Sequence, residues 1–328
     1  MVKVPKGYRS RNVRRTSSGG GSRSRRSSSG LGGSFGGGGG GGLGGGLGGA
    51  LAGGAASGLG RRGGCGGIVG LLIIGVIAII FISSIGGGGG TTNTTTNATQ
   101  AETDVDNCAG FGNEVLDACD LANFVLDDVQ DNFWVDEYPA VFGSEYQFSQ
   151  LLLFENNVST GGCGNATSAV GPFYCPADGF AYIDLQFMLQ LQDQLGAEGD
   201  FAQAYILAHE IGHHVQNLAG INATVRQQQS RVGRVESNAL LVMLELQADC
   251  FAGAWAQSAD QRGNILDDGD LNEGVQAAGS VGDDAITGST NQENFTHGSS
   301  AQRIEWFTAG FQGGAASCGT FDGSIFPG

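Results

Sequence analysis

The sequence predicts an α+β fold that is mostly helical with a small sheet, preceded by a disordered tail and one transmembrane helix. Three observations support this prediction. Gly, Ser and Arg dominate the first 67 residues, an uncharged apolar run follows them, and the remainder holds two long helical patterns and a short β-rich segment. A single compact domain of all 328 residues is therefore excluded.

The charge distribution separates the amino-terminal tail from the rest of the chain. Eleven of the 16 Lys and Arg residues lie before position 66, where no acidic residue occurs. The remainder has five Arg and no Lys against all 32 acidic residues, which leaves a net charge of −27. Because Gly, Ser and Arg bury little apolar surface, we expect residues 1–67 to form a disordered cytoplasmic tail. The acidic remainder repels phosphate, which argues against a nucleic-acid partner.

Residues 68–85 form an apolar run without charge. As a helix this run is about 27 Å long, close to the hydrocarbon thickness of about 30 Å. The alternative, a buried core helix, is disfavoured because every face of the run is apolar. Arg61 and Arg62 precede the run, and no cation lies near its far side. The positive-inside rule therefore predicts a single-pass protein of the cell membrane, with a cytoplasmic amino terminus and the acidic domain outside.

The residues beyond the apolar run divide into a stalk and a domain. Residues 86–104 contain a Gly run and a Thr/Asn run, which indicate a flexible stalk, and residues 105–328 form the predicted extracytoplasmic domain. Its six cysteines suit three disulfides in an oxidising compartment, with reduced core cysteines as the alternative. The sequence permits fifteen pairings. Short spacings favour Cys108–Cys119 and Cys163–Cys175, which leaves Cys250–Cys318.

A helix is predicted over residues 200–219. Its apolar residues recur at helical spacing, Asp200 stands at the N-cap position and Gly220 follows the last turn. Three of the four His residues of the chain fall inside this segment, within the hexapeptide HEIGHH at 209–214.

The spacing of these residues predicts a metal site. His209 and His213 lie one turn apart on the same helix face, so both imidazoles reach one cation while Glu210 leans over it. This HExxH arrangement is typical of zinc proteases, in which the His residues bind the metal and the Glu is the general base. The alternative is a solvated polar face on which Glu210 pairs with His214.

A second predicted helix, residues 230–259, supplies the missing ligand. Glu245 and Asp249 stand one turn apart in an otherwise apolar run. Buried carboxylates without partners are unfavourable, so this pair requires a cation. We expect Glu245 to be the third metal ligand and Asp249 to orient a ligating His through its other ring nitrogen. An ion pair with Arg231 or Arg234, or simple solvation, is the alternative.

Several stretches carry a family resemblance. They are residues 171–178, 182–185, 200–204, 208–216, 244–253, 297–303, 306–307 and 318–321. Together they resemble the neutral zinc metallopeptidase family of bacteria and some archaea over about residues 105–321. The resemblance implies a zincin fold of the gluzincin type, one Zn²⁺ per chain and hydrolysis of a peptide or protein substrate.

Three further features have more than one interpretation. His297 lies among the matched residues and is expected to stabilise the transition state or support the site; the alternative is that it caps a helix starting near Ser300. In a zincin, the strand predicted at 182–185 pairs with an extended substrate, but it is equally compatible with an internal position. Asp270 with Glu273 indicates a capping box rather than a calcium loop.

The sequence thus predicts a membrane-anchored, extracytoplasmic zinc metallopeptidase. The alternative is a non-catalytic, zinc-stabilised binding or scaffold module at the cell surface. A structural zinc site has four protein ligands, whereas a catalytic site keeps one position for water. The oligomeric state stays open.

Overall fold

The computed structural model describes residues 2–15, 108, 111–195, 199–263 and 265–321. These residues belong to one compact unit, which is mostly helical with a small sheet, as predicted. Its strands are β1 (Val13–Arg15), β2 (Gln150–Phe154), β3 (Asn157–Ser159), β4 (Asn165–Thr167), β5 (Phe173–Cys175) and β6 (Phe180–Asp184). Its α-helices are α2 (Leu116–Val129), α3 (Val135–Phe142), α4 (Leu185–Leu195), α5 (Phe201–Leu218), α6 (Ile221–Gln229), α7 (Arg234–Arg262), α8 (Asp270–Ser280), α9 (Asp283–Thr287) and α10 (Ser300–Gly313).

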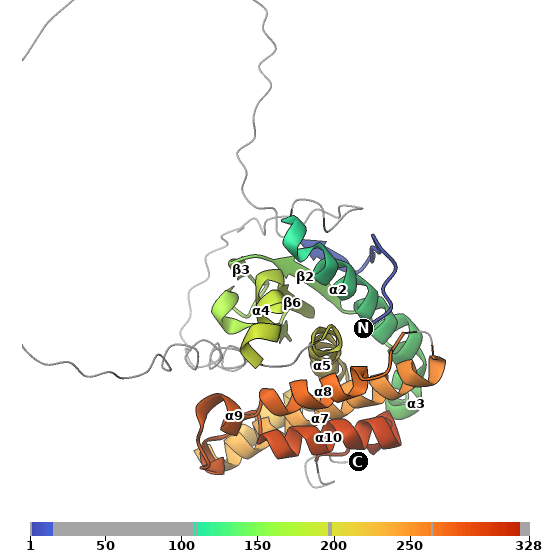
Figure 1. The fold of residues 1–328 in the computed structure, drawn as a ribbon. Helices are drawn as coiled ribbons and strands as arrows, with labels where there is room; N and C mark the ends of the chain where they lie inside the picture. The colour runs from blue at the N-terminus through green and yellow to red at the C-terminus, as the bar shows by residue number, and fades with distance from the viewer. Residues whose placement is uncertain (1, 16–107, 109–110, 196–198, 264, 322–328) are drawn as a thin grey trace, which may run out of the picture. The chain divides into compact units, whose positions relative to one another are not determined.

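Helix α5 lies at the centre of this arrangement (Figure 1). The strands lie with α2 and α4 on one side of it, and α7, α8 and α10 lie on the other. From Phe201 to Gln216 every residue of α5 is buried. A helix buried on all faces needs internal partners for its polar side chains, which here include three His and one Glu.

The main sheet has the strand order β1-β2-β6-β5. Strands β1, β2 and β6 run parallel, and β5 pairs antiparallel with β6. The strand predicted at 182–185 is part of β6, which is internal because β2 and β5 occupy its two edges. Of the two interpretations, the internal position is therefore confirmed and the pairing with a substrate is excluded for this strand; β5 is the terminal strand on that side of the sheet.

The hydrogen bonds at the amino-terminal ends of α5 and α8 differ from the prediction. Asp200 occupies the N-cap position of α5 but makes no side-chain cap bond. Instead, Oε2 of Glu273 accepts a hydrogen bond from the backbone N of Phe201 at 3.3 Å. The capping box predicted for Asp270 and Glu273 is therefore wrong, because Glu273 turns towards the neighbouring helix.

Helix α7 is the long helix predicted over 230–259, although it begins later. The extended backbone of Gly233 precedes its first turn, and Gly263, in the left-handed conformation, ends it. Among the described residues, α7 alone is long and apolar enough to span a membrane, but 78% of its most apolar window is buried inside the fold. We therefore interpret α7 as the core helix that carries Glu245 and Asp249.

Helices α7 and α10 pack against each other at two glycines. A Cβ at Gly253 would lie 2.0 Å from the carbonyl oxygen of Phe307, and one at Gly310 would lie 1.9 Å from that of Cys250. The two backbones therefore touch where any side chain would separate them. Ser299, and not His297, caps α10, through a capping box with Gln302.

The expectation that residues 1–67 are disordered is wrong for residues 2–15. Val2 and Val13 are each 4% exposed, and β1 continues the sheet. The average composition of the tail concealed this short segment, whose cations face an acidic domain. The rest of the predicted tail, the apolar run 68–85 and the stalk 86–104 lie outside the described residues.

The three disulfides favoured by the sequence spacing are confirmed in the structure. They join Cys108 to Cys119, Cys163 to Cys175 and Cys250 to Cys318. The third bond begins at the residue next to Asp249, so it ties the segment after α10 to the middle of α7.

Candidate metal centre

The helices that carry the predicted ligands approach each other closely at a glycine. Gly212 lies between His209 and His213 on α5 and faces Ala248 of α7. A Cβ at position 212 would lie 3.1 Å from the Cα of Ala248, closer than ordinary van der Waals contact. Because glycine has no Cβ, the two helices come near enough for the imidazoles of α5 to reach the carboxylates of α7.

The three predicted ligands converge on one point. Nε2 of His209 lies 3.3 Å from Oε2 of Glu245, and Nε2 of His213 lies 3.3 Å from Oε1 of the same carboxylate. One donor atom from each residue lies within 4.8 Å of the others, and all three side chains are buried. The structure thus brings together the three residues that the spacing singled out.

Asp249 connects this cluster to Tyr205 of α5 and to one further helix, α10. Its Oδ1 accepts from Nδ1 of His209 at 2.9 Å and from the hydroxyl of Tyr205 at 2.5 Å. The guanidinium of Arg303, on α10, donates to both carboxylate oxygens of Asp249 at 2.8 Å. The predicted contact between Asp249 and a ligand His is therefore present. It leaves Nε2 of His209 facing Glu245.

Gln216 has the corresponding place beside His213. Its Oε1 lies 2.8 Å from Nδ1 of His213, and its amide nitrogen donates to the carbonyl oxygen of Leu244 at 2.7 Å. The same nitrogen also donates to Oε1 of Gln247 at 3.1 Å. An amide oxygen accepts only, so this bond holds a proton on Nδ1 and leaves Nε2 of His213 as the metal-binding nitrogen.

The charges of the cluster shift the pKa values of its members. Burial alone would lower the pKa of His209, but the neighbouring carboxylates of Asp249 and Glu245 outweigh burial and raise it to about 9. Burial acts in the opposite direction on Glu245, and the imidazoles of His213 and His209 outweigh it, so the pKa of Glu245 is well below its usual value. Glu245 is therefore anionic at neutral pH.

The donor set fits a divalent cation. Nε2 of His213 and Oε2 of Glu245 are buried and make no hydrogen bond within the described part of the chain. Buried polar atoms are nearly always partnered, and a cation between the three side chains provides that partner. Imidazole nitrogen and carboxylate oxygen are ligands that zinc prefers, so the residues present fit Zn²⁺.

The net charge of the buried side chains leads to the same conclusion. Glu210, Glu245 and Asp249 carry three carboxylates, and Arg303 carries one guanidinium; all four residues are at most 4% exposed. Imidazoles that bind a metal are neutral, so with ionised carboxylates the metal-bound state has three negative charges against one positive charge, which leave −2; without a metal, a proton on His209 offsets part of this charge. A buried excess of charge is strongly unfavourable, and one divalent cation neutralises it.

Glu210 follows the first ligand on α5 and is 4% exposed. Burial raises its pKa, although the nearby imidazoles of His213 and His209 act in the opposite direction. A buried carboxyl group with a raised pKa is suited to accept and release a proton.

Comparison with known proteins assigns the chain to a family. The sequence model of the family described as "Putative neutral zinc metallopeptidase" matches residues 11–321. The chain belongs to this family. The matched region contains both ligand-bearing helices and also β1, near the start of the chain.

Two relatives of this chain match it over 64% and 54% of its length. The uncharacterized protein YpfJ of Escherichia coli strain K12 is 46% identical over 214 residues, which cover 64% of this chain and 73% of that protein. The uncharacterized protein Mb2605 of Mycobacterium bovis is 47% identical over 191 residues, which cover 54% of this chain and 63% of that protein. No solved structure matches the chain significantly.

The family region also contains His297, whose expected role stays a prediction. Its Nδ1 lies 2.8 Å from Oδ1 of Asp283, and its backbone N donates to Oδ2 of Asp283 at 2.7 Å. The next residue, Gly298, faces Val242 and Leu246, on the turns of α7 that adjoin Glu245. Asp283 thus fixes the His297 ring in a loop beside the ligand-bearing helix.

Sequence reasoning missed three residues of the centre: Tyr205, Gln216 and Arg303. Each is buried and hydrogen-bonded to a ligand or to Asp249. Tyr205 carries a detectable signal, because it precedes His209 by one helical turn. Gln216 follows His213 by three residues and therefore shares its face. Arg303 lies 54 residues beyond Asp249, and only the packing of α10 on α7 reveals its role.

His214 belongs to a different environment, although it follows His213 directly. Its Nδ1 lies 3.1 Å from the hydroxyl of Tyr174, and its Nε2 lies 2.6 Å from the carbonyl oxygen of Gln147. Burial lowers the pKa of His214 to about 4. The neutral ring therefore joins α5 to the segment before β2, and the alternative pairing of Glu210 with His214 is not observed among the described contacts.

Proposed function

We propose that this chain is a zinc-dependent metallopeptidase of the gluzincin type, with Glu210 as general base. One observation carries the proposal: two buried imidazoles on α5 and a buried carboxylate on α7 face one point, directly beside a buried Glu. His209, His213 and Glu245 would hold one Zn²⁺. Membership of the zinc metallopeptidase family supports this reading.

The side chains have separate roles in peptide hydrolysis. When bound, zinc supplies a Lewis acid that polarises a carbonyl oxygen and lowers the pKa of a bound water from about 16 to about 7. Glu210 takes the proton of the attacking water and delivers it to the leaving amine. Asp249 and Gln216 hold the rings of His209 and His213 in the tautomers that direct Nε2 inwards.

The substrate is a peptide or protein, as the family implies. Extended peptides bind by adding a strand to the edge of a sheet. On the side of the sheet away from β1 the terminal strand is β5, which packs against α5. We propose β5 as the strand that pairs with the substrate.

The domain is proposed to act outside the cytoplasm. Its three disulfides are stable in oxidising compartments and rare in the cytosol. The apolar run at residues 68–85 is proposed to attach the chain to the membrane.

The alternative is a zinc-stabilised scaffold without catalysis. Such a site is closed by four protein ligands. Within the described residues, His209, His213 and Glu245 form a group of three, which favours a site with an open position. A buried Glu210 beside the first ligand also has no structural task in a closed site.

The test compares Glu210→Gln with the unmodified chain and with Glu305→Gln, a control on the exposed face of α10. We expect Glu210→Gln to bind zinc normally but to cleave a mixed peptide library about 10²- to 10⁴-fold more slowly, because the general base is lost. The control should match the unmodified chain. Undiminished cleavage by Glu210→Gln would refute its role, and an unmodified chain that binds no zinc would refute the whole proposal.

A further inference from the structure

The amino-terminal arm, residues 2–15, is an integral part of the folded domain. Its strand β1 pairs in parallel with β2, with Val13 opposite Leu151 and Arg15 opposite Leu153. The backbone N of Leu151 also donates to the carbonyl oxygen of Asn12 at 2.8 Å. The arm therefore occupies the edge of β2 and extends the main sheet by one strand.

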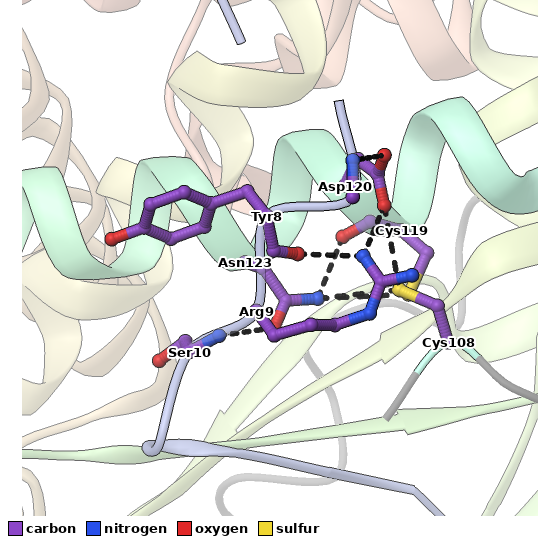
Figure 2. Close-up of a disulfide and its surroundings, with 8 residues drawn as sticks. Tyr8, Arg9, Ser10, Cys108, Cys119, Asp120 and Asn123 are labelled. Carbon is purple, nitrogen blue, oxygen red and sulfur yellow. Dashed lines mark hydrogen bonds and ion pairs between the residues drawn. A yellow bond between two sulfur atoms is a disulfide. The ribbon is translucent and has the colours of Figure 1, made fainter. Parts of the chain in front are cut away.

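Side chains fix the arm to α2 as well. Arg9 forms an ion pair with Asp120, and the backbone N of Ser10 donates to Oδ1 of Asn123 at 2.9 Å (Figure 2). The hydroxyls of Ser10 and Tyr8 donate to Asp127 at 2.6 and 3.1 Å. These contacts are directional, so they specify one position for the arm.

Charge complementarity supports the same docking. The arm contributes cations to a domain that has no Lys and a large acidic excess. Besides the Arg9 pair, Nζ of Lys3 lies 2.9 Å from Oδ1 of Asp267, and the backbone N of Lys3 donates to the carbonyl oxygen of Ile265 at 2.9 Å. Cations of the arm thus form ion pairs with the domain at two separate places, one on α2 and one before α8, in addition to the pairing of β1 with β2.

A disulfide lies directly beneath this docked arm. Asn123, which accepts from Ser10, donates to the carbonyl oxygen of Cys119 at 2.8 Å and contacts the sulfur of Cys108 at 3.5 Å (Figure 2). The arm and the Cys108–Cys119 bond therefore share one buried side chain. A disulfide forms in an oxidising compartment, and the arm that packs on it must be in that compartment too.

We infer that the amino-terminal arm and the metallopeptidase domain lie on the same, extracytoplasmic side of the membrane. Two strands of one sheet cannot be separated by a bilayer, yet a single crossing by residues 68–85 would place the arm and the domain on opposite sides. The chain between the arm and the domain therefore crosses the membrane an even number of times or not at all, which replaces the single crossing expected from the basic residues.

The inference uses the arm and the disulfides and does not depend on catalysis. Its test labels single cysteines in the full chain, in cells, with a membrane-impermeant maleimide. Cys65→Ser removes the one cysteine outside the three disulfides. The reporters are Lys6→Cys, on the exposed part of the arm, and Glu145→Cys, on the exposed surface of the domain.

We expect both reporters to be labelled to the same extent in intact cells. Labelling of Glu145→Cys in intact cells with Lys6→Cys reactive only after lysis would overturn the inference. Labelling of both only after lysis would overturn the extracytoplasmic assignment. These outcomes are independent of zinc binding and peptide cleavage, so they do not test the proposed enzyme.

A third reporter tests docking itself. Val13→Cys lies in the same arm but at a buried position, 4% exposed. It should stay unlabelled in intact cells and react after the chain is unfolded in denaturant. If Val13→Cys reacts as fast as Lys6→Cys in cells, the arm is not docked and the inference fails. Arg9→Glu, which removes the ion pair with Asp120, should speed the labelling of Val13→Cys, and adding Asp120→Arg should slow it again.

Discussion

Two groups of side chains in the described residues have the spacing to hold a cation, and they differ in their surroundings. His209, His213 and Glu245 are all buried, and the second nitrogen of each imidazole is already hydrogen-bonded. Asp200, Asp270 and Glu273 also bring donor atoms within 4.8 Å of one another, but they are all carboxylates, and only Asp270 is buried.

The acidic group has a different task in the fold. Glu273 accepts the first backbone N–H of α5, and Asp270 accepts that of Asp267 at 3.0 Å. Carboxylates at helix amino termini satisfy free N–H groups and complement the helix dipole. Short distances between donor atoms are therefore weak evidence for a metal. Mixed ligand types, full burial and fixed ring orientation together distinguish the first group.

The strongest test of this comparison removes one residue from each group. We expect His213→Ala to reduce bound zinc from about one ion per chain to near none, because two ligands hold zinc much more weakly than three. Asp270→Asn should retain full zinc. Metal analysis of the purified variants measures both. Equal zinc loss in the two variants would erase the distinction between the groups.

A smaller effect is expected from the difference between a buried His that has a carboxylate partner and a buried His that has none. His209 has Asp249 and a pKa raised to about 9, whereas His214 has neutral partners and a pKa lowered to about 4. Because the unfolded chain protonates His near pH 6.5, the stability that neutral His214 contributes is complete above that pH. It is lost as the pH falls towards 4, by up to about 3 kcal/mol.

His214→Gln isolates this contribution. In metal-free protein, the difference in unfolding free energy between the unmodified chain and His214→Gln should shrink between pH 6.5 and 4. Urea unfolding at a series of pH values measures it. A difference that stays constant over this range would contradict the assignment of a neutral, buried ring.

The residues around His209 should affect the affinity for zinc. We expect Asp249→Asn and Arg303→Met each to weaken zinc binding by about 10- to 100-fold, because His209 loses its orientation. Chelator competition gives the affinity without recourse to activity. Arg226→Met, on α6 away from the Asp249 network, is the matched control. Unchanged affinity in Arg303→Met would show that Asp249 orients His209 without help.

The smallest effect is expected in the acidic group. Glu273→Gln keeps an oxygen that can accept from Phe201, so it should change the unfolding free energy by less than about 0.5 kcal/mol. Its zinc affinity should equal that of the unmodified chain. Chemical denaturation and chelator competition provide the two measurements, and a marked loss of zinc affinity would make the acidic group part of the metal site.

The sequence predicted those features of the centre that depend on local periodicity. The spacing of His209 and His213 places both rings on one helix face, and the same rule pairs Glu245 with Asp249. The meeting of these two faces requires the packing of α5 on α7 at Gly212, which no periodicity encodes. Arg303 is still less visible, since it enters from α10.

The amino-terminal arm was mispredicted for a physical reason. Averaging composition over 67 residues weighs long Gly-rich stretches equally with a short segment that finds many partners. Val13 and Ser10 are ordered by the edge of β2 and by α2, both more than a hundred residues away in the sequence. Disorder inferred from composition assumes that no distant surface compensates the loss of chain entropy, and here one does.

The two glycine contacts between α7 and α10 also set the position of Arg303 relative to Asp249. Arg303 lies seven residues before Gly310 on α10, which is about two helical turns or about 10 Å along the helix axis. A single methyl group at position 253 or 310 would clash with the backbone of the other helix and push α10 away from α7. The guanidinium would be carried away from Asp249, and the affinity for the ion would change without a substitution at any group that touches it.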